Sequence, residues 1–129
     1  MEIIIIDDDK IIAMIHQKLL TLQGIYSTRI FTQATEAFEY LNEYAHDVEK
    51  QFLILLDINM PSMDGWEFAN KAEKLKNLDN CTFYFVTSSV NEKDRIRAKK
   101  INLIQGLIEK PLTKNKMKTL TDKLDKVFQ

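Results

Sequence analysis

The 129-residue chain has few of the residues that interrupt or cross-link a protein, with three glycines, two prolines and one cysteine. So little glycine and proline excludes a collagen-like repeat or a disordered linker, and leaves most of the chain free to form helices and strands. A single cysteine, Cys81, excludes an intrachain disulfide and a two-cysteine redox motif. We therefore expect Cys81 to be a buried, small apolar residue in a reducing compartment.

Long hydrophobic runs are also lacking. The chain opens with four isoleucines followed by three aspartates, without a basic leader. This start predicts no signal peptide, no membrane span and a cytoplasmic protein. With 45% hydrophobic and 29% charged residues, we expect one domain over residues 1–129 and no separate output domain.

Neither sign of charge dominates the whole chain, whose net charge is -1, but the two parts differ. Residues 1–91 carry 7 basic and 14 acidic side chains, whereas residues 92–129 carry 11 and 5. The basic part mixes lysines with acids and has no interleaved aromatic residues, which favours a solvated helix surface over nucleic-acid binding. A docking face for an acidic partner is the alternative.

Five short apolar runs have the length of β-strands, and three of them are continuous, as in strands buried on both faces of a parallel sheet. Apolar residues three and four positions apart fill the intervals, which is typical of helices. This alternation predicts an α/β fold of five βα units, a doubly wound parallel five-stranded sheet with helices on both faces. The runs are residues 3–6, 26–31, 52–56, 82–86 and 104–108.

The first predicted helix carries an apolar stripe that we expect to face the core, with Asp9 as its N-cap. His16 in this helix, and His46 further along, have polar neighbours and no second metal ligand at a suitable spacing, so both are predicted to be surface histidines. Tyr84 and Phe85 are predicted to belong to a buried strand. The stripe consists of Ile11, Ile12, Ile15, Leu19 and Leu22.

The last two predicted helices differ in how firmly the sequence anchors them. The helix from Asn91 to about residue 101 has a possible cap but few apolar side chains, so we expect it to be weakly held. The helix after Thr113 has a capping hydroxyl, with Leu112 and Met117 placed as a hydrophobic staple.

Polar residues of kinds that carry out chemistry follow four of the five apolar runs, within three positions of the end of each run. In open α/β sheets the carboxyl ends of the strands meet at one edge, where ligands bind. We therefore expect carboxylates, hydroxyls and an ammonium group to gather there. The residues are Asp7, Asp8, Asp9, Asp57, Thr87, Ser88, Ser89 and Lys110.

Such a group of aspartates favours a metal-assisted phosphoryl reaction. Adjacent carboxylates raise one another's pKa, and a hard divalent cation such as Mg²⁺ removes that repulsion. A carboxylate can then attack a phosphoryl group to form an aspartyl phosphate, while a lysine and a hydroxyl stabilise the transferred oxygens. Asp57, Lys110 and Thr87 fit those three roles.

The segments IIIIDDD, LLDINMPSMDG, FVTSS and IEKP, in this order on the predicted strands, resemble the receiver domain of bacterial two-component response regulators of the stand-alone, chemotaxis-regulator type. The resemblance covers the whole chain. It implies a flavodoxin-like fold with strand order 2-1-3-4-5, which puts the first and third strands side by side.

The resemblance also implies roles for single residues. Asp57 matches the phosphoacceptor, Thr87 the hydroxyl that follows the phosphoryl group, and Lys110 the lysine that pairs with it. Lys110 precedes a proline, Pro111, whose peptide bond is cis in this family. Asn59 and Ser89, two places beyond Asp57 and Thr87, resemble the positions that tune the dephosphorylation rate in this family. The implied Mg²⁺ ligands are Asp8 and Asp57 directly, Asp7 through water, and the backbone carbonyl of Asn59.

The family's partners follow from the same resemblance. A sensor histidine kinase or a histidine phosphotransfer protein would supply the phosphoryl group. A downstream protein would bind the face formed by the fourth helix, fifth strand and fifth helix, and neither nucleic acid nor membrane is implied. The chain would be no enzyme beyond promoting its own phosphorylation and dephosphorylation.

Three other functions compete with a phosphoaccepting receiver. A phosphohydrolase of the haloacid dehalogenase type would begin with Asp7-x-Asp9, but the chain lacks the following Thr or Val and is too short for that family's cap. A flavin-binding domain of the same fold needs a phosphate loop where this chain has aspartates, which would repel the phosphate. A pseudo-receiver that binds partners without phosphorylation is the remaining alternative.

One position departs from the family pattern. Receivers usually carry Tyr or Phe three residues before the lysine, and this chain has Leu107. Leucine provides neither a phenolic hydroxyl nor a large rotating ring. The aromatic part of the switch is therefore absent, or it is replaced by movement of the loop after Thr87 and of the weakly held fourth helix. We take the second alternative as our hypothesis.

This inference predicts that phosphorylation changes amide hydrogen exchange in residues 87–101. Hydrogen exchange followed by mass spectrometry, with and without phosphorylation, measures the change. Unchanged exchange throughout that segment would contradict the inference.

Overall fold

The computed structural model describes residues 1–25, 27–45, 47, 49–75 and 78–127, without the side chains of residues 124–127. The predictions for Tyr26 and His46 lie outside the described residues. None of the described helices is long and apolar enough to cross a membrane.

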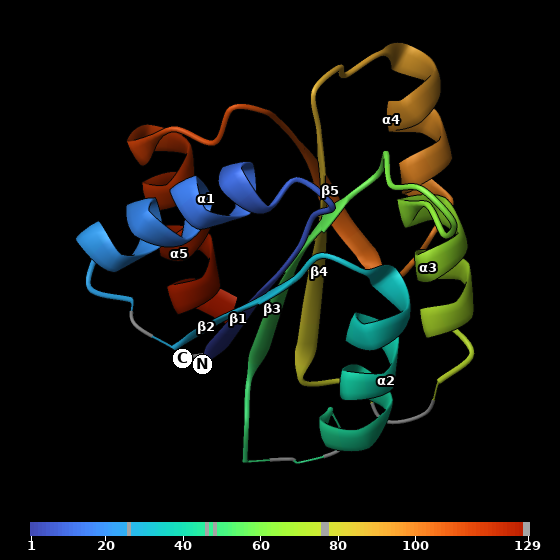
Figure 1. Ribbon diagram of the computed structural model, residues 1–129, viewed down its shortest axis with the longest axis horizontal. Helices are drawn as coiled ribbons and strands as arrows, with labels where there is room; N and C mark the ends of the chain where they lie inside the picture. Colours follow the sequence, from blue (N-terminus) through green and yellow to red (C-terminus); the bar gives the residue numbers. More distant parts are fainter. Residues whose placement is uncertain (26, 46, 48, 76–77, 128–129) are drawn as a thin grey trace.

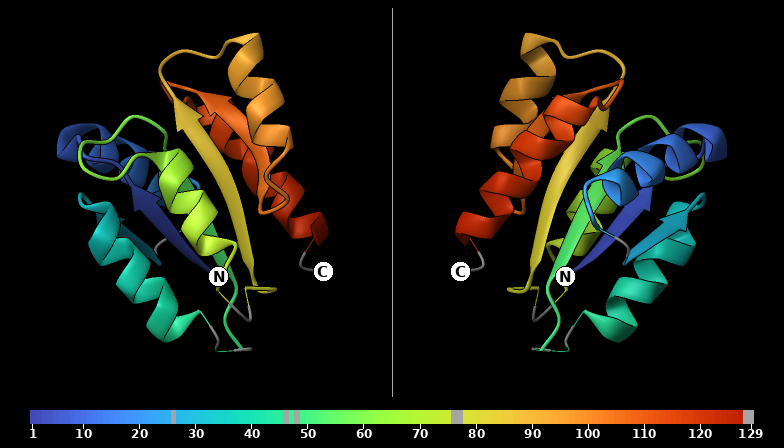
Figure 2. Two further views of the ribbon diagram at one scale, coloured as in Figure 1. Left: turned by 90° about the vertical axis from the view of Figure 1, so that its right-hand side faces the viewer. Right: turned by 90° about the vertical axis from the view of Figure 1, so that its left-hand side faces the viewer.

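The chain forms one five-stranded parallel sheet in the order β2-β1-β3-β4-β5, so the predicted fold class and strand order are confirmed. Figures 1 and 2 show the sheet between two helical layers, α1 and α5 on one face and α2, α3 and α4 on the other. The elements are β1 (Glu2–Ile6), α1 (Lys10–Leu22), β2 (Thr28–Phe31), α2 (Ala34–Tyr44), β3 (Phe52–Asp57), α3 (Gly65–Ala72), β4 (Cys81–Thr87), α4 (Glu92–Lys99), β5 (Ile104–Glu109) and α5 (Lys114–Val127).

The continuous apolar runs form the centre of the sheet, as expected. All six residues of β3 are buried, because helices cover both of its faces. Alternate side chains of the central strands belong to two separate hydrophobic clusters, one under each helical layer. Tyr84 and Phe85 both lie in β4, most of whose later residues are buried. Phe85 is fully buried, whereas Tyr84 is only partly buried, and its ring borders a surface cleft.

The predicted helix caps are confirmed. The Asp9 carboxylate accepts hydrogen bonds from the backbone N–H groups of Ile11 and Ile12, Asn91 caps α4, and the Thr113 hydroxyl accepts from the N–H of Lys116. Each cap satisfies donors that the first helical turn leaves free.

Few apolar contacts hold α4, as its sequence predicts. Of its eight residues, Ala98 is the buried one. Arg97 stacks over the Trp66 ring of α3 at 4.2 Å from the ring centroid, and the same ring packs edge-on against Phe85. A cation–π contact is a modest anchor for a helix.

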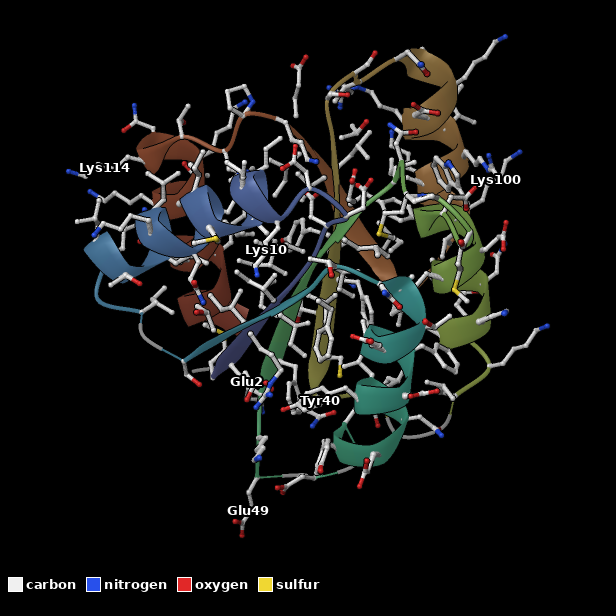
Figure 3. All side chains as sticks on the ribbon, viewed as in Figure 1. Glu2, Lys10, Tyr40, Glu49, Lys100 and Lys114 are labelled. Atoms are coloured by element: carbon white, nitrogen blue, oxygen red, sulfur yellow. The ribbon has the colours of Figure 1, made fainter. Side chains whose placement is uncertain are left out.

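The amino end of the sheet is fixed by polar contacts far from the polar carboxyl edge. The Tyr40 hydroxyl donates to the Glu2 carboxylate at 2.8 Å, and the Arg29 guanidinium lies over the Tyr40 ring at 4.6 Å from its centroid. Figure 3 shows Glu2 and Tyr40 near one another at this end. These contacts join α2 to β1 and β2.

The predicted orientation of α1 is wrong. Its buried residues are Ala13, His16 and Leu20, while Ile11, Ile15 and Leu22 of the expected stripe are 71%, 54% and 66% exposed. The helix is apolar on both sides, so periodicity alone does not choose its buried face. Small Ala13 lets this side of α1 approach the sheet closely.

His16 is consequently not a surface histidine, because only 3% of it is exposed. It lies on the buried face of α1, above the sheet, and burial lowers its pKa against the opposing influence of the Asp7 carboxylate. A neutral imidazole is the form that this environment favours.

The corrected orientation predicts unequal effects of truncating α1. Leu20→Ala should cost about 2–5 kcal/mol because it opens a cavity in the core, whereas Ile15→Ala at an exposed position should cost less than about 1 kcal/mol. Urea unfolding of both variants measures the difference. Equal losses would contradict the observed orientation.

Candidate functional site

The sheet order brings two aspartates from distant parts of the sequence together. Ile6 of β1 pairs with Leu56 of β3. The residues that follow these two along the chain, Asp7 and Asp57, therefore lie side by side at the carboxyl edge of the sheet. Only 2% of Asp7 and 4% of Asp57 are exposed. Two carboxylates held together with little water repel each other unless a cation lies between them.

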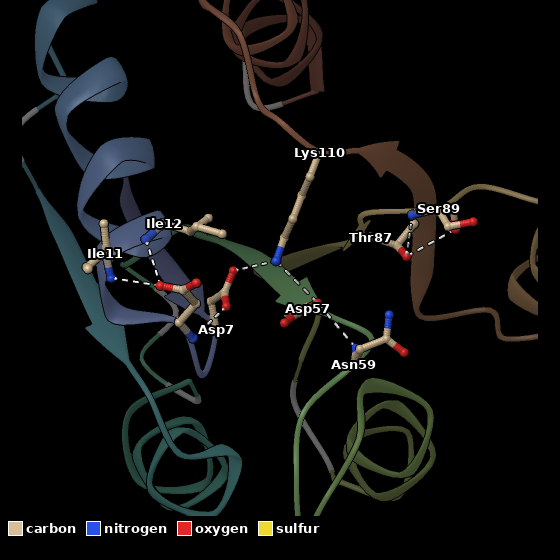
Figure 4. Close-up of polar contacts among 9 residues, drawn as sticks. Asp7, Ile11, Ile12, Asp57, Asn59, Thr87, Ser89 and Lys110 are labelled. Carbon is tan, nitrogen blue, oxygen red and sulfur yellow. Dashed lines mark hydrogen bonds and ion pairs between the residues drawn. The ribbon is translucent and has the colours of Figure 1, made fainter.

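Lys110, directly after β5, supplies that cation. Its ammonium nitrogen lies 2.7 Å from Asp7 Oδ2 and 3.4 Å from Asp57 Oδ1, and Figure 4 shows it reaching between the two carboxylates. The backbone N–H of Lys110 donates to the carbonyl of Thr87 at 2.7 Å, which fixes the lysine to β4. The Lys110–Pro111 peptide bond is cis, as the resemblance predicts.

One ammonium group does not balance two buried carboxylates. Burial, reinforced by the charge of Asp7, raises the pKa of Asp57 to about 6, although Lys110 and the Asn59 N–H act in the opposite direction. Burial would lower the pKa of Lys110, but the hydrogen bond and charge of Asp7 and the charge of Asp57 raise it. The site therefore favours additional positive charge.

The third aspartate completes a set of oxygen ligands. Asp8 is exposed, and one carboxylate oxygen from each of Asp7, Asp8 and Asp57 lies within 4.8 Å of the others. Carboxylate oxygens at this spacing, open to solvent on one side, fit a hard divalent cation such as Mg²⁺. Asp9, in contrast, is used as the cap of α1.

The loop after Asp57 is held close to the site by its backbone. The N–H of Asn59 donates to Asp57 Oδ1 at 3.2 Å, and the N–H of Gly65 donates to the carbonyl of Ile58 at 2.8 Å. A Cβ at position 65 would lie 2.7 Å from the Asp57 carbonyl oxygen, so this approach requires glycine. Asn59 itself is exposed. The family resemblance implies that its backbone carbonyl contacts the metal.

Thr87 lies at the same edge, but its hydroxyl points elsewhere. The residue ends β4 and is 1% exposed. Its hydroxyl donates to the Ser89 carbonyl at 3.2 Å and accepts from the Ser89 N–H at 3.3 Å, as Figure 4 shows. The structure thus brings Lys110 into contact with Asp7 and Asp57 and places Asp8 nearby, with Thr87 and Ser89 at the same edge.

The sequence did not reveal that His16 belongs to the surroundings of this site. The charges of Asp7 and Lys110 both act on its pKa, which places the imidazole near the ion pair. One feature of the sequence could have indicated that His16 is buried. It lies three positions after Ala13 and four before Leu20, so the three residues share one helix face, which is the buried face of α1.

The raised pKa of Asp57 predicts a pH-dependent effect of neutralising it. Its pKa in the folded state, about 6, exceeds the ordinary value of 3.8 for an aspartate in an unfolded chain. Ionised Asp57 therefore destabilises the fold above pH 6, and this cost disappears below the unfolded pKa. Asp57→Asn should therefore raise the free energy of unfolding at pH 7 by roughly 1–3 kcal/mol. The gain should shrink as pH falls toward 4. Urea unfolding without divalent metal measures both values, and a gain independent of pH would refute the electrostatic explanation.

The geometry of this edge agrees with comparisons to known proteins. A family model for the response regulator receiver domain matches residues 3–122. The chain is 29% identical over 122 residues to a probable transcriptional regulator, ycf29, of Porphyra purpurea, covering 95% of this chain and 55% of that protein. It is 34% identical over 95 residues to the sensor histidine kinase CheAY of Helicobacter pylori, covering 74% of this chain and 11% of that protein. The chain thus spans about half or less of these curated relatives.

Solved structures show the same fold. A response regulator receiver protein from Dyadobacter fermentans superimposes with a TM-score of 0.84 at 27% identity, covering 95% of both chains. A two-component response regulator from Cytophaga hutchinsonii also gives 0.84, at 24% identity and 95% coverage of both chains. With the family model matching most of the chain, this protein belongs to the response regulator receiver domain family.

Proposed function

We propose that this receiver domain accepts a phosphoryl group on Asp57 in a Mg²⁺-dependent reaction and signals through protein contacts. A sensor histidine kinase or a histidine phosphotransfer protein would be the donor. The observation that carries this proposal is the Lys110 ammonium between the buried carboxylates of Asp7 and Asp57.

Asp57 is the nucleophile in this proposal. One of its carboxylate oxygens forms a bond to phosphorus, the bond between phosphorus and the donor's imidazole nitrogen breaks, and the imidazole leaves with that electron pair and takes up a proton. The reaction needs ionised Asp57, which Lys110 favours. The N–H of Asn59 holds one carboxylate oxygen in place.

Lys110 and Thr87 would stabilise the transferred oxygens. The Lys110 ammonium is already 3.4 Å from Asp57 Oδ1, so it needs to move little to contact a phosphoryl oxygen. The Thr87 hydroxyl has to exchange its Ser89 carbonyl partner for that oxygen. Fixed donors aimed at developing charge are an efficient source of transition-state stabilisation.

Asp7, Asp8, Asp57 and the Asn59 carbonyl would hold Mg²⁺. When bound, the cation neutralises the carboxylates and the negative charge of the phosphoryl oxygens. Support comes from the three carboxylate oxygens within 4.8 Å of one another and from the raised pKa of Asp57.

The exposed apolar side of α1 supports a protein donor. Ile11, Met14 and Ile15 are 71%, 52% and 54% exposed, and α1 begins three residues after Asp7. Large exposed apolar groups mark interaction surfaces. A donor that rests on them would present its phosphohistidine at the same edge of the sheet.

The downstream partner would bind the face of α4, β5 and α5, where residues 92–129 carry 11 basic and 5 acidic side chains. We expect no enzymatic activity beyond phosphorylation and dephosphorylation of the domain itself. A single receiver domain over residues 1–129 and a cytoplasmic location stay predictions.

The intact acidic cluster argues against the pseudo-receiver alternative. A binding module that works without phosphorylation has no use for two adjacent buried carboxylates, one of which, Asp57, has its pKa raised to about 6 by burial and by the charge of Asp7. Retaining such a cost at one edge of the sheet is typical of a functional site.

The proposal predicts that the protein gains the mass of one phosphoryl group on incubation with Mg²⁺ and acetyl phosphate. The gain should disappear in Asp57→Asn and with a chelator, because both remove a component of the acceptor site. Intact-protein mass spectrometry measures it.

Asp64→Asn is the matched control for this measurement. Asp64 caps α3 and is outside the cluster, and asparagine caps helices equally well. Phosphorylation of the control with none in Asp57→Asn supports the proposal. Equal labelling of the wild type and Asp57→Asn, or no labelling of the wild type by acetyl phosphate or a phosphohistidine donor, would refute it.

A further inference from the structure

The outer edge of β5 is only partly protected by the described residues. β5 is the last strand of the sheet and ends on one charged residue, Glu109. Its residues 104–108 (IQGLI) include no charged residue and no proline, two of the usual means of blocking an edge. The N–H of Lys110 points inward, to Thr87 of β4. Because backbone groups alternate along a strand, those of Leu107 and Glu109 point outward.

Much of this edge is available to a new strand. Within the described part of the chain, no helix or loop forms a hydrogen bond to the backbone of Leu107. The Glu109 carbonyl accepts from the Lys116 ammonium at 2.8 Å. A bulge between the pairs at Phe83 and Tyr84 gives β5 one extra residue, Gln105, which limits regular pairing to the part of the strand after it.

Two clefts lie on opposite faces of this strand at the same residues. One, of about 350 Å³, lies between β5 and α5 and includes Tyr84, Gly106 and Leu120. The other, of about 160 Å³, lies between β5 and α4 and includes Ala98, Ile104 and Leu107. Both clefts share the segment Gln105 to Leu107, and Figure 2 shows α4 and α5 on either side of β5.

Gly106 keeps the larger cleft open. A Cβ at this position would lie 3.0 Å from Cε1 and 3.2 Å from Cδ1 of the Tyr84 ring. Without that atom, the ring stays partly exposed and lines the cleft.

The rims of both clefts are basic. Lys116 and Lys123 line the larger cleft, Arg95 and Lys99 line the smaller one, and no carboxylate among the described side chains lines either. None of these four cations forms an ion pair with a described side chain. A partner with carboxylates would therefore find cations that no described carboxylate neutralises.

We propose that the edge of β5 binds an extended, acidic segment of a partner protein as a sixth strand. Consecutive side chains of a strand point to opposite faces, so one apolar side chain would enter the cleft over Tyr84 and the next the cleft beside Ala98. Backbone hydrogen bonds would supply affinity and the two clefts specificity, as in other cases of strand addition.

This inference deepens the downstream half of the proposed function by naming the kind of partner and its binding mode. It does not require Asp57 to be phosphorylated, since both clefts are present in the structure described. Binding is therefore measured on the unmodified full chain, and its outcome is separate from the phosphorylation test.

The probe is a short synthetic peptide with the central sequence Thr-Val-Phe-Val-Thr between Asp and Glu residues, blocked at both ends. Titration into the ¹⁵N-labelled full chain should shift the amide signals of β5 and of the two cleft linings, and slow the exchange of the Leu107 amide. A peptide N-methylated at the pairing positions keeps every side chain but loses strand pairing, and should bind at least about tenfold more weakly.

Protein variants test the charge and the cleft separately. Lys123→Glu should weaken binding roughly 3- to 10-fold, whereas Lys118→Glu, on the same helix but outside the clefts, should change it less than about twofold. Gly106→Ala should weaken binding by filling the cleft, and circular dichroism checks that it folds.

Several results would overturn the inference. One is that the peptide shows no saturable binding at millimolar concentration, and another is that the N-methylated peptide binds equally well. The others are equal effects of the two lysine variants on binding, and amide signal shifts confined to α1 or β2. Sedimentation tests the other occupant, because self-association through β5 that the peptide does not disrupt would assign the edge to a second copy of this chain.

Discussion

The site depends on one lysine shared by two buried carboxylates. The Lys110 ammonium lies 2.7 Å from Asp7 and 3.4 Å from Asp57, so a single positive charge offsets two negative ones in a place with little water. The remaining negative charge raises the pKa of Asp57 to about 6, with burial as the largest cause. That deficit makes the edge receptive to a divalent cation.

The rest of the fold serves to hold these three groups in place. β1 beside β3 sets the two aspartates next to each other, and the backbone of Lys110 is tied to Thr87 on β4. Because Gly65 has no side chain, the end of the loop that follows β3 can lie close to the Asp57 carbonyl. The central strands are buried on both faces, so these positions rest on the most firmly packed part of the molecule.

Much of this could be predicted from the sequence, because continuous apolar runs and the polar residues after them are local signals. The strand order and the grouping of Asp7, Asp57 and Lys110 followed from the resemblance and from parallel topology. The face of α1 could not be predicted, since the helix is apolar on both sides and tertiary packing chose Ala13, His16 and Leu20. The partner of the Thr87 hydroxyl and the opening over Tyr84 also depend on contacts between distant segments.

If Asp57 accepts a phosphoryl group, as we propose, the Lys110 ammonium has to exchange one of its carboxylate contacts for a phosphoryl oxygen. A crystal structure with Mg²⁺ and beryllium fluoride, which mimics a phosphoryl group on aspartate, tests it most directly. The account predicts the fluoride group on Asp57, the Lys110 ammonium on a fluorine, and the Thr87 hydroxyl turned from Ser89 toward the same group. Beryllium fluoride bound elsewhere, or bound to Asp57 with Lys110 and Thr87 in their present contacts, would contradict it.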